Sequence, residues 1–147
     1  MDNTQQQQQQ NKQLVTGFFT ALNEGRLDDL GDYLAADIVD HNKIIHGEPD
    51  EPGAAFAAIA MQLEALKPYH AKVEELIAEG DQVVARITQS GTSSGAHPRM
   101  PVPTGRRFEN EAIFILTVRA GRISELRGVS DRLGLFLQLG WDWPTID

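Results

Sequence analysis

The pattern of the stretch GRISELRGVSDRLGLFLQLG, residues 121–140, predicts the end of a strand followed by the beginning of a helix. Polar and apolar residues mix at 122–130 as they do in a half-buried strand, whereas the apolar residues of 133–140 have helical spacing. Asp131 stands at the junction, where a carboxylate can lie at the rim of a core, half out of water. Partial burial raises the pKa of a carboxyl group, so Asp131 is a candidate acid or base.

Upstream of this stretch the pattern predicts an antiparallel meander. The expected strands are 69–78, 82–91, 106–119 and 122–130. Short turns at 79–81 and 120–121 join two pairs of them, and a long loop rich in Gly, Pro and Ser covers 92–105. Strands that follow one another through short turns pair antiparallel.

The first half of the chain is mostly helical in pattern. Apolar residues at helical spacing predict helices at 14–22, at 27–35 and from Pro52 to Leu66, and a first strand is expected at 37–41. Helices followed by a meander indicate the α+β class, with a curved sheet covered by helices on one face. Residues 1–12 include an unbroken Gln run at 5–10 and predict a disordered start, which leaves 13–147 as a single domain.

Composition excludes several functions. The 147 residues carry a net charge of −8, which disfavours nucleic acid and anionic membranes as partners. There is no cysteine, and the four histidines lack the spacing of metal ligands, so we expect no metal site. No segment is long and apolar enough to span a bilayer, and a signal peptide is not evident, so a cytoplasmic location is the default expectation.

The hairpin turn at 120–121 predicts a pairing register for the last two strands. If Arg119 faces Arg122, most of the side chains on one face of the hairpin are apolar. We expect the helices to cover that face. Four polar residues share that predicted face with Phe114, Leu116 and other apolar residues: they are Asn110, Glu125, Arg127 and Asp131. Two explanations stay open: a structural ion network at the sheet end, or the polar lining of a ligand cavity. A one-residue bulge would change the register.

The chain resembles the SnoaL-like polyketide cyclases, which belong to the wider fold group of nuclear transport factor 2. The resemblance covers nearly all of the chain after the Gln run and rests on short strings in the family's order and spacing. These strings are Asp40-His41-Asn42, Leu76-Ile77-Ala78-Glu79-Gly80-Asp81, Gly91-Thr92, Pro103-Thr104-Gly105-Arg106, Gly121-Arg122-Ile123, Asp131-Arg132-Leu133-Gly134 and Gln138-Leu139-Gly140.

The resemblance implies a cone-shaped sheet with helices on its concave face, a deep apolar pocket, no cofactor, and a homodimer formed through the outer face of the sheet. It implies a small-molecule substrate of polyketide or polycyclic type. Asp131 matches the family's acidic residue that acts as general acid/base in an intramolecular aldol closure. Many members carry His-Trp in the last strand, whereas this chain has Leu126-Arg127.

From these observations we predict a cofactor-free cyclase of secondary metabolism, with Asp131 as catalytic residue. Asn110, Arg127, His41, Asn42 and Phe114 are the candidate substrate-binding residues. Each has a structural alternative: Asp131 can be a helix N-cap, and Arg127 can belong to an ion pair. Two other functions stay open, a non-catalytic ligand-binding or dimerisation module and an epoxide-opening or hydroxylating relative.

Overall fold

The computed structural model describes residues 3–45, 48 and 51–142, and it confirms the α+β class. The elements are α1 (Asn3–Asn23), the 3-10 helix η1 (Leu27–Asp32), β1 (Leu34–Asp40), α2 (His41–Ile45), α3 (Ala54–Ala65), β2 (His70–Glu79), β3 (Gln82–Thr92), β4 (Arg107–Arg119), β5 (Arg122–Ser130) and α4 (Arg132–Gln138). The four strands of the predicted meander are therefore confirmed, with end residues that differ by at most one position. Among the described residues, no helix has the length and apolar character needed to cross a membrane.

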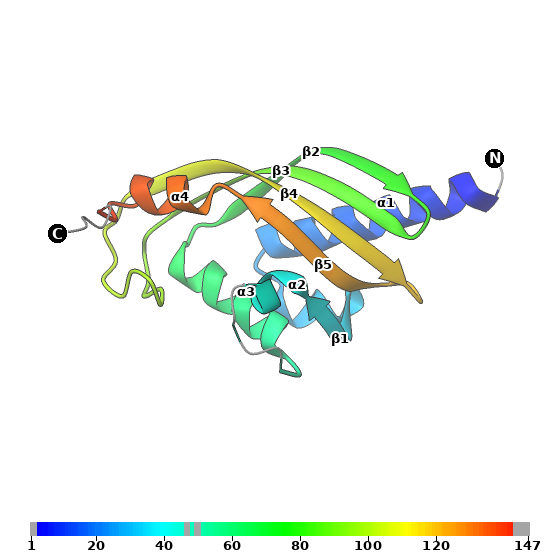
Figure 1. The fold of residues 1–147 in the computed structure, drawn as a ribbon, viewed down its shortest axis with the longest axis horizontal. Helices are drawn as coiled ribbons and strands as arrows, with labels where there is room; N and C mark the ends of the chain where they lie inside the picture. Colours follow the sequence, from blue (N-terminus) through cyan, green and yellow to red (C-terminus); the bar gives the residue numbers. More distant parts are fainter. Residues whose placement is uncertain (1–2, 46–47, 49–50, 143–147) are drawn as a thin grey trace.

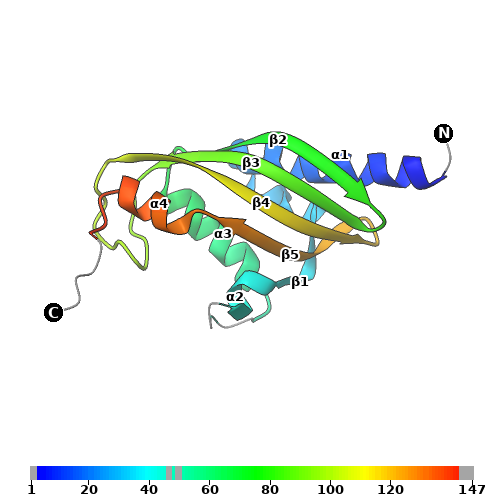
Figure 2. The same cartoon turned by 45° about the horizontal axis from the view of Figure 1, so that its top comes forward.

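The sheet has five strands in the order β1-β5-β4-β3-β2. Strands β2 to β5 pair antiparallel, whereas β1 joins the edge of β5 in parallel. Figures 1 and 2 show that the sheet is curved and that α1 and α3 lie on its inner side. The strand β1 comes from the helical half of the chain, so it closes one side of the space between helices and sheet.

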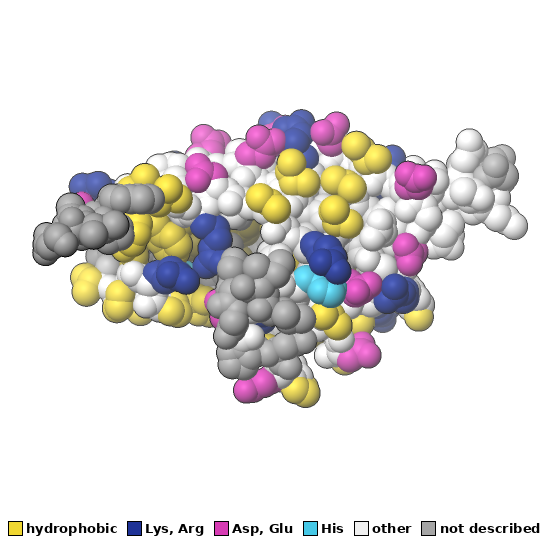
Figure 3. Space-filling model, viewed as in Figure 1, with side chains coloured by type: hydrophobic (Ala, Val, Ile, Leu, Met, Phe, Trp, Pro, Cys, Tyr) yellow, Lys and Arg dark blue, Asp and Glu magenta, His cyan; other side chains and the backbone are white. Residues whose placement is uncertain are grey.

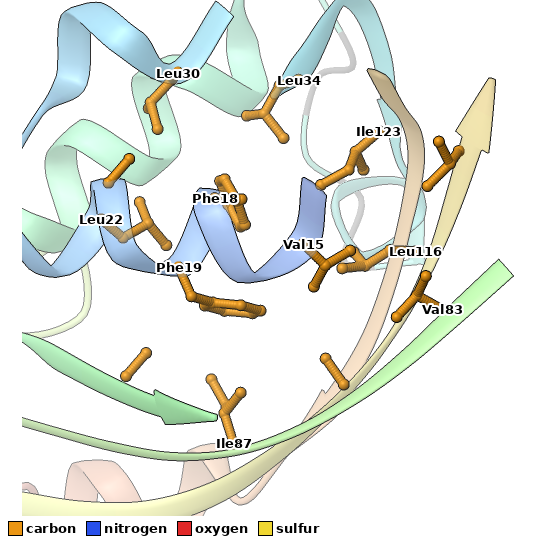
Figure 4. Packing of buried hydrophobic residues seen from close by; sticks show 14 of the residues in the cluster. Val15, Phe18, Phe19, Leu22, Leu30, Leu34, Val83, Ile87, Leu116 and Ile123 are labelled. Carbon is orange, nitrogen blue, oxygen red and sulfur yellow. The ribbon is translucent and has the colours of Figure 1, made fainter. Parts of the chain in front are cut away.

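The core lies between α1 and the inner face of β3, β4 and β5. Apolar residues of α1 recur at helical spacing and therefore share one face of the helix. Figure 4 shows this face, Val15, Phe18, Phe19 and Leu22, packed toward the inward residues Val83, Ile87, Leu116 and Ile123 of the sheet. A second cluster of buried residues joins α4 to the end of α3 and the start of β4: Ala65, Leu66, Met100, Phe108, Leu135 and Leu139.

A β-bulge in β5 changes the predicted register. Val118 faces Ile123 as expected, but the register then shifts, and Thr117 faces Glu125 while Phe114 faces Gly128. The physical reason is the three-residue spacing of Ile123 and Leu126, because a regular strand cannot turn both side chains to the same face. The extra residue of the bulge lets both join the core. The predicted inward placement of Glu125 and Arg127 is therefore wrong.

The Gln run is helical in the structure. The helix α1 begins at Asn3 and includes residues 5–10, where the sequence predicted a disordered start. Glutamine has a good intrinsic helix propensity, and a run continuous with an amphipathic helix extends that helix. The Gln7 Nε2 donates to Asn11 Oδ1 at 2.9 Å, and Asn11 is buried. Low complexity therefore did not prevent order in residues 3–12.

Candidate active site

Two adjoining chambers lie between the helices and the inner face of the sheet. The inner chamber has a volume of about 180 Å³ and is lined mainly by apolar residues of α1, α3, β4 and β5. The outer chamber, of about 510 Å³, extends toward the loop before β4 and the start of α4. Six residues line both chambers: Asp40, Asn42, Ala58, Gln62, Gln89 and Phe114. The chambers therefore form one cavity with an apolar end, a polar middle and a wide mouth, which is the usual form of a small-molecule site.

Asp40 brings a carboxylate to the middle of this cavity. It is the last residue of β1 and pairs with Leu126, so its side chain shares the inner face with the core residues of β5. The side chain is half-buried, and its Oδ1 accepts the backbone N–H of Asn42 at 3.0 Å. A carboxylate held in this way has a fixed orientation, and it can accept a proton from a ligand in either chamber.

Asn42 ties the turn after β1 to β5. Its Oδ1 accepts the backbone N–H of Gly128 at 3.0 Å. Gly128 is required here, because a Cβ at this position would lie 2.5 Å from the ring of Phe114. The Phe114 ring in turn lies 6.4 Å, centroid to centroid, from Phe19. This packing fixes Asn42 and Phe114 in the cavity wall, where the prediction of substrate contact placed them.

A buried pair, Tyr69 and Gln89, provides a hydrogen-bond donor for the cavity. The Tyr69 hydroxyl donates to Gln89 Oε1 at 2.8 Å. Burial raises the pKa of Tyr69, so its phenol stays protonated and keeps donating. Because the amide oxygen of Gln89 is occupied, the amide NH₂ is the part of the side chain that can meet a ligand in the cavity. Such a donor suits an oxygen atom that becomes negative during a reaction.

The structure places Asp131 away from the cavity lining. Its side chain is exposed, and its Oδ1 accepts the backbone N–H of Gly134 at 2.8 Å, as the N-cap of α4. The predicted half-buried position at the rim of the core is therefore wrong, and the capping alternative describes the geometry. The reason is local, because an Asp one residue before a helix satisfies an otherwise unpaired N–H. The neighbours of Asp131 in sequence, Ser130 and Arg132, do line the outer chamber.

Asn110 points inward but does not line either chamber. Its Nδ2 donates to the backbone oxygen of Asp131 at 2.9 Å, which joins β4 to the start of α4. Its Oδ1 is buried and has no hydrogen-bond partner among the residues that the structure describes. Asn110 was predicted to bind substrate, but its side chain does not line the cavity in this structure.

His41 and Arg127 lie on the outer side of the sheet. The bulge turns Glu125 and Arg127 outward, and His41 contacts Glu125 on that side. The His41 Nε2 contacts Glu125 Oε1 at 3.0 Å, and Arg119 Nη1 lies 3.1 Å from Glu125 Oε2. The hydrogen bond from His41 is the main cause that lowers the pKa of Glu125, and the charge of Arg119 adds to it while burial opposes it. Arg127 is exposed and faces Ile115 across the strand pair. Neither residue lines the cavity.

Among the residues that line both chambers, three polar ones were missed at the sequence level: Asp40, Gln62 and Gln89. A signal for Gln89 existed, because Val83, Ala85 and Ile87 alternate inward and Gln89 continues the same face as a polar residue. Asp40 belongs to the family string 40–42, in which the sequence predicts only His41 and Asn42 as substrate-binding residues. Within the described part of the chain, no cluster of three or more His, Asp or Glu residues could hold a metal ion.

These features define a small α+β protein that encloses a ligand-sized cavity between its helices and a curved sheet. The chain belongs to the SnoaL-like polyketide cyclase family, whose model matches residues 12–139. The resemblance inferred from the sequence is thereby confirmed.

Relatives at about a third identity span nearly the whole chain. The aklanonic acid methyl ester cyclase DnrD of Streptomyces peucetius is 32% identical over 134 residues, which cover 90% of this chain and 92% of the relative. The nogalonic acid methyl ester cyclase of Streptomyces nogalater is 33% identical over 127 residues, covering 85% and 93%. The structure of TsrD from Streptomyces laurentii superimposes with a TM-score of 0.79 at 28% identity, covering 95% of this chain and 98% of that one.

Proposed function

We propose that this chain is an enzyme that closes a ring on an aromatic polyketide ester by an intramolecular aldol reaction. The observation that carries the proposal is the half-buried carboxylate of Asp40 at the middle of a continuous cavity. Relatives named as methyl ester cyclases support the reaction class. The coarser statement, that the chain is by homology a polyketide cyclase of secondary metabolism, follows from family membership.

In the proposed reaction, the Asp40 carboxylate removes a proton from the carbon beside a substrate carbonyl. The resulting enolate oxygen accepts a hydrogen bond from the Gln89 amide, which Tyr69 holds in place. The enolate carbon attacks a second carbonyl of the same molecule, and the protonated Asp40 returns its proton to the new alkoxide. All atoms of the substrate remain in the product, so the reaction is an isomerisation.

The surrounding residues orient the Asp40 carboxylate and form the wall against which the substrate would pack. Asn42 donates its backbone N–H to Asp40 and, through Gly128, connects the carboxylate to the sheet. Phe114, with Phe19 beside it, offers an aromatic wall for the rings of the substrate. No cofactor takes part in this scheme, and the absence of one stays a prediction, as does a cytoplasmic location.

Asp131 is the competing candidate for the acid/base role, because the resemblance to the family implies it. Its cap bond to Gly134 and its exposure favour a structural role, whereas the half-buried position of Asp40 favours catalysis. The two carboxylates belong to different elements, β1 and the start of α4, so substitutions can separate them.

The proposal is tested by incubating the purified chain with aklanonic acid methyl ester and analysing the products by mass spectrometry. We expect a new product with the mass of the substrate, because aldol closure neither adds nor removes atoms. A product that has gained a water molecule or an oxygen atom would instead support the epoxide-opening or hydroxylating alternative. Tight binding without any product would support the non-catalytic binding module.

We further propose that the outer face of the sheet forms a homodimer. Its exposed apolar residues lie on β2, β4 and β5, where Ile113 pairs with Val129, and Figure 3 shows apolar side chains over the strands of this face. They are Ile77, Ile113, Ile115 and Val129, with exposed fractions of 56%, 44%, 38% and 79%. An exposed apolar patch on a sheet is typical of a protein–protein interface.

The substitution Ile113→Glu should convert a dimer to a monomer, because it places a charge in the middle of the buried patch. Sedimentation equilibrium measures the mass directly. Val102→Glu, on an exposed loop residue away from the sheet, is the matched control and should leave the mass unchanged. A wild-type monomer, or an Ile113→Glu dimer, would contradict the proposal.

A further inference from the structure

The loop between β3 and β4 brings a histidine, His97, to the wall of the outer chamber. The backbone N–H groups of Ser94 and Gly95 donate to the Ala65 oxygen at the end of α3, at 3.1 and 3.0 Å. His97 and Met100 then exchange two backbone hydrogen bonds of 3.1 and 2.9 Å, which close a tight turn. The Met100 side chain is buried in the second cluster. The loop is therefore attached to the core on both sides of His97, and its imidazole has a defined place in the cavity wall.

The two ring nitrogens of His97 have different roles. Nδ1 accepts the backbone N–H of Arg99 at 3.1 Å. A nitrogen that accepts a hydrogen bond carries no proton, so the proton of the neutral ring lies on Nε2. Nε2 is therefore a donor, and it forms no hydrogen bond with any residue that the structure describes. It is the nitrogen that can meet a ligand.

The imidazole of His97 is neutral at pH 7. Burial is the main cause that lowers the pKa of His97. The charges of Arg132 and Arg99 lower this pKa further, whereas the charge of Glu48 raises it. The ring of Phe136 packs edge-on against the imidazole, with a centroid distance of 5.2 Å and an interplanar angle of 62°. The ring is thus a neutral donor that its neighbours hold in one orientation.

A neutral N–H donor suits an uncharged oxygen that only accepts, such as the carbonyl of a ketone or an ester. A carbonyl that enters the cavity gives up its hydrogen bonds to water and needs a donor there. The reaction proposed above assigns Asp40 to proton transfer and Gln89 to the enolate oxygen. It involves a second carbonyl, for which that scheme names no donor.

We propose that His97 donates from Nε2 to a carbonyl oxygen of the substrate in the outer chamber, while the rings of the substrate extend toward the apolar inner chamber. This inference rests on the proposed function, and it specifies an uncharged carbonyl as the group that the outer chamber recognises. It assigns to the loop between β3 and β4 a direct contact with the substrate.

Equilibrium binding of two uncharged probes tests the proposal: 2-acetylanthracene and 2-isopropenylanthracene, in which a methylene group replaces the carbonyl oxygen. His97→Phe keeps a ring beside Phe136 but has no donor. It should weaken binding of the ketone about threefold to tenfold, the range of one neutral hydrogen bond, and change the affinity for the alkene less than about twofold. His97→Gln keeps an N–H donor of similar reach and should restore part of the affinity for the ketone.

His70→Phe is the matched control, because His70 is an exposed histidine at the start of β2 that lines neither chamber. It should bind both probes as the wild type does, and thermal melts of all variants show whether the fold is kept. A folded His97→Phe variant that keeps the affinity for the ketone, or that weakens both probes equally, would overturn the proposal, as would a wild-type chain that binds neither probe. Binding is measured without turnover, so a chain that binds as expected but closes no ring contradicts the cyclase function alone.

Discussion

The substitution Asp40→Asn should lower the rate of ring closure by about 100-fold to 10,000-fold, the range that a positioned acid/base supplies. Asparagine has the size of aspartate and keeps the oxygen that accepts the Asn42 N–H. It cannot take up the proton of the substrate. The loss should therefore appear in kcat and kcat/KM, measured from product formation, while the thermal melting temperature stays close to that of the wild type.

Two further variants make this result specific. Asp37→Asn removes an exposed carboxylate from the same strand and should leave turnover unchanged. Asp131→Asn keeps a side chain that can cap α4, and it should retain most of the activity if Asp40 is the acid/base. If Asp131→Asn loses activity while Asp40→Asn keeps it, the assignment to Asp40 is wrong and the role implied by the family resemblance is correct.

The substitution Phe108→Ala should reduce the free energy of unfolding by about 3–5 kcal/mol. Phe108 is 2% exposed and belongs to the cluster that joins α4, the end of α3 and the start of β4. A cavity at this point cannot close easily, because Gly91 lies against the ring: a Cβ at Gly91 would be 3.0 Å from Phe108 Cε1. Urea denaturation measures the change, from the midpoint and slope of the transition.

Val102→Ala is the control for this experiment. Val102 is 76% exposed, and truncating it should change the free energy of unfolding by no more than about 0.5 kcal/mol. A loss below about 1 kcal/mol for Phe108→Ala would show that the second cluster contributes less to stability than its burial indicates.

Most of the fold could be predicted from local patterns. The sequence predicts three local features well: the hairpin of β4 and β5, the turn between β2 and β3, and the apolar stripe of α1. Each has a pattern of residue types that few other structures produce. Two features escaped these patterns. Ile123 and Leu126 are three residues apart, and a rule of strict alternation has no place for the bulge that brings both inside. The Gln run has low complexity, but its good helix propensity lets it continue α1 toward the N-terminus.

The candidate site was harder to predict, because it depends on which strands meet. The inward face of β4 was predicted correctly, so Phe114 was found. The role of Asp40 depends on the parallel pairing of β1 with β5, which joins residues 86 positions apart in the case of Asp40 and Leu126. Nothing in the local sequence of either strand fixes that pairing. Gln89 was within reach of sequence analysis, since a polar residue on an otherwise apolar inward face indicates a cavity or a buried hydrogen bond.

The bulge in β5 also bears on how relatives with this architecture can diverge. Beyond the extra residue, Leu126 faces the cavity and Arg127 faces the outer side of the sheet, because successive side chains of a strand point to opposite faces. Deleting or inserting one residue there would exchange the inward-facing and outward-facing side chains of β5 at once. Arg127 would then point toward the bound ligand. One insertion or deletion in β5 would therefore replace several cavity-lining side chains in a single evolutionary event, whereas point mutations would replace them one at a time.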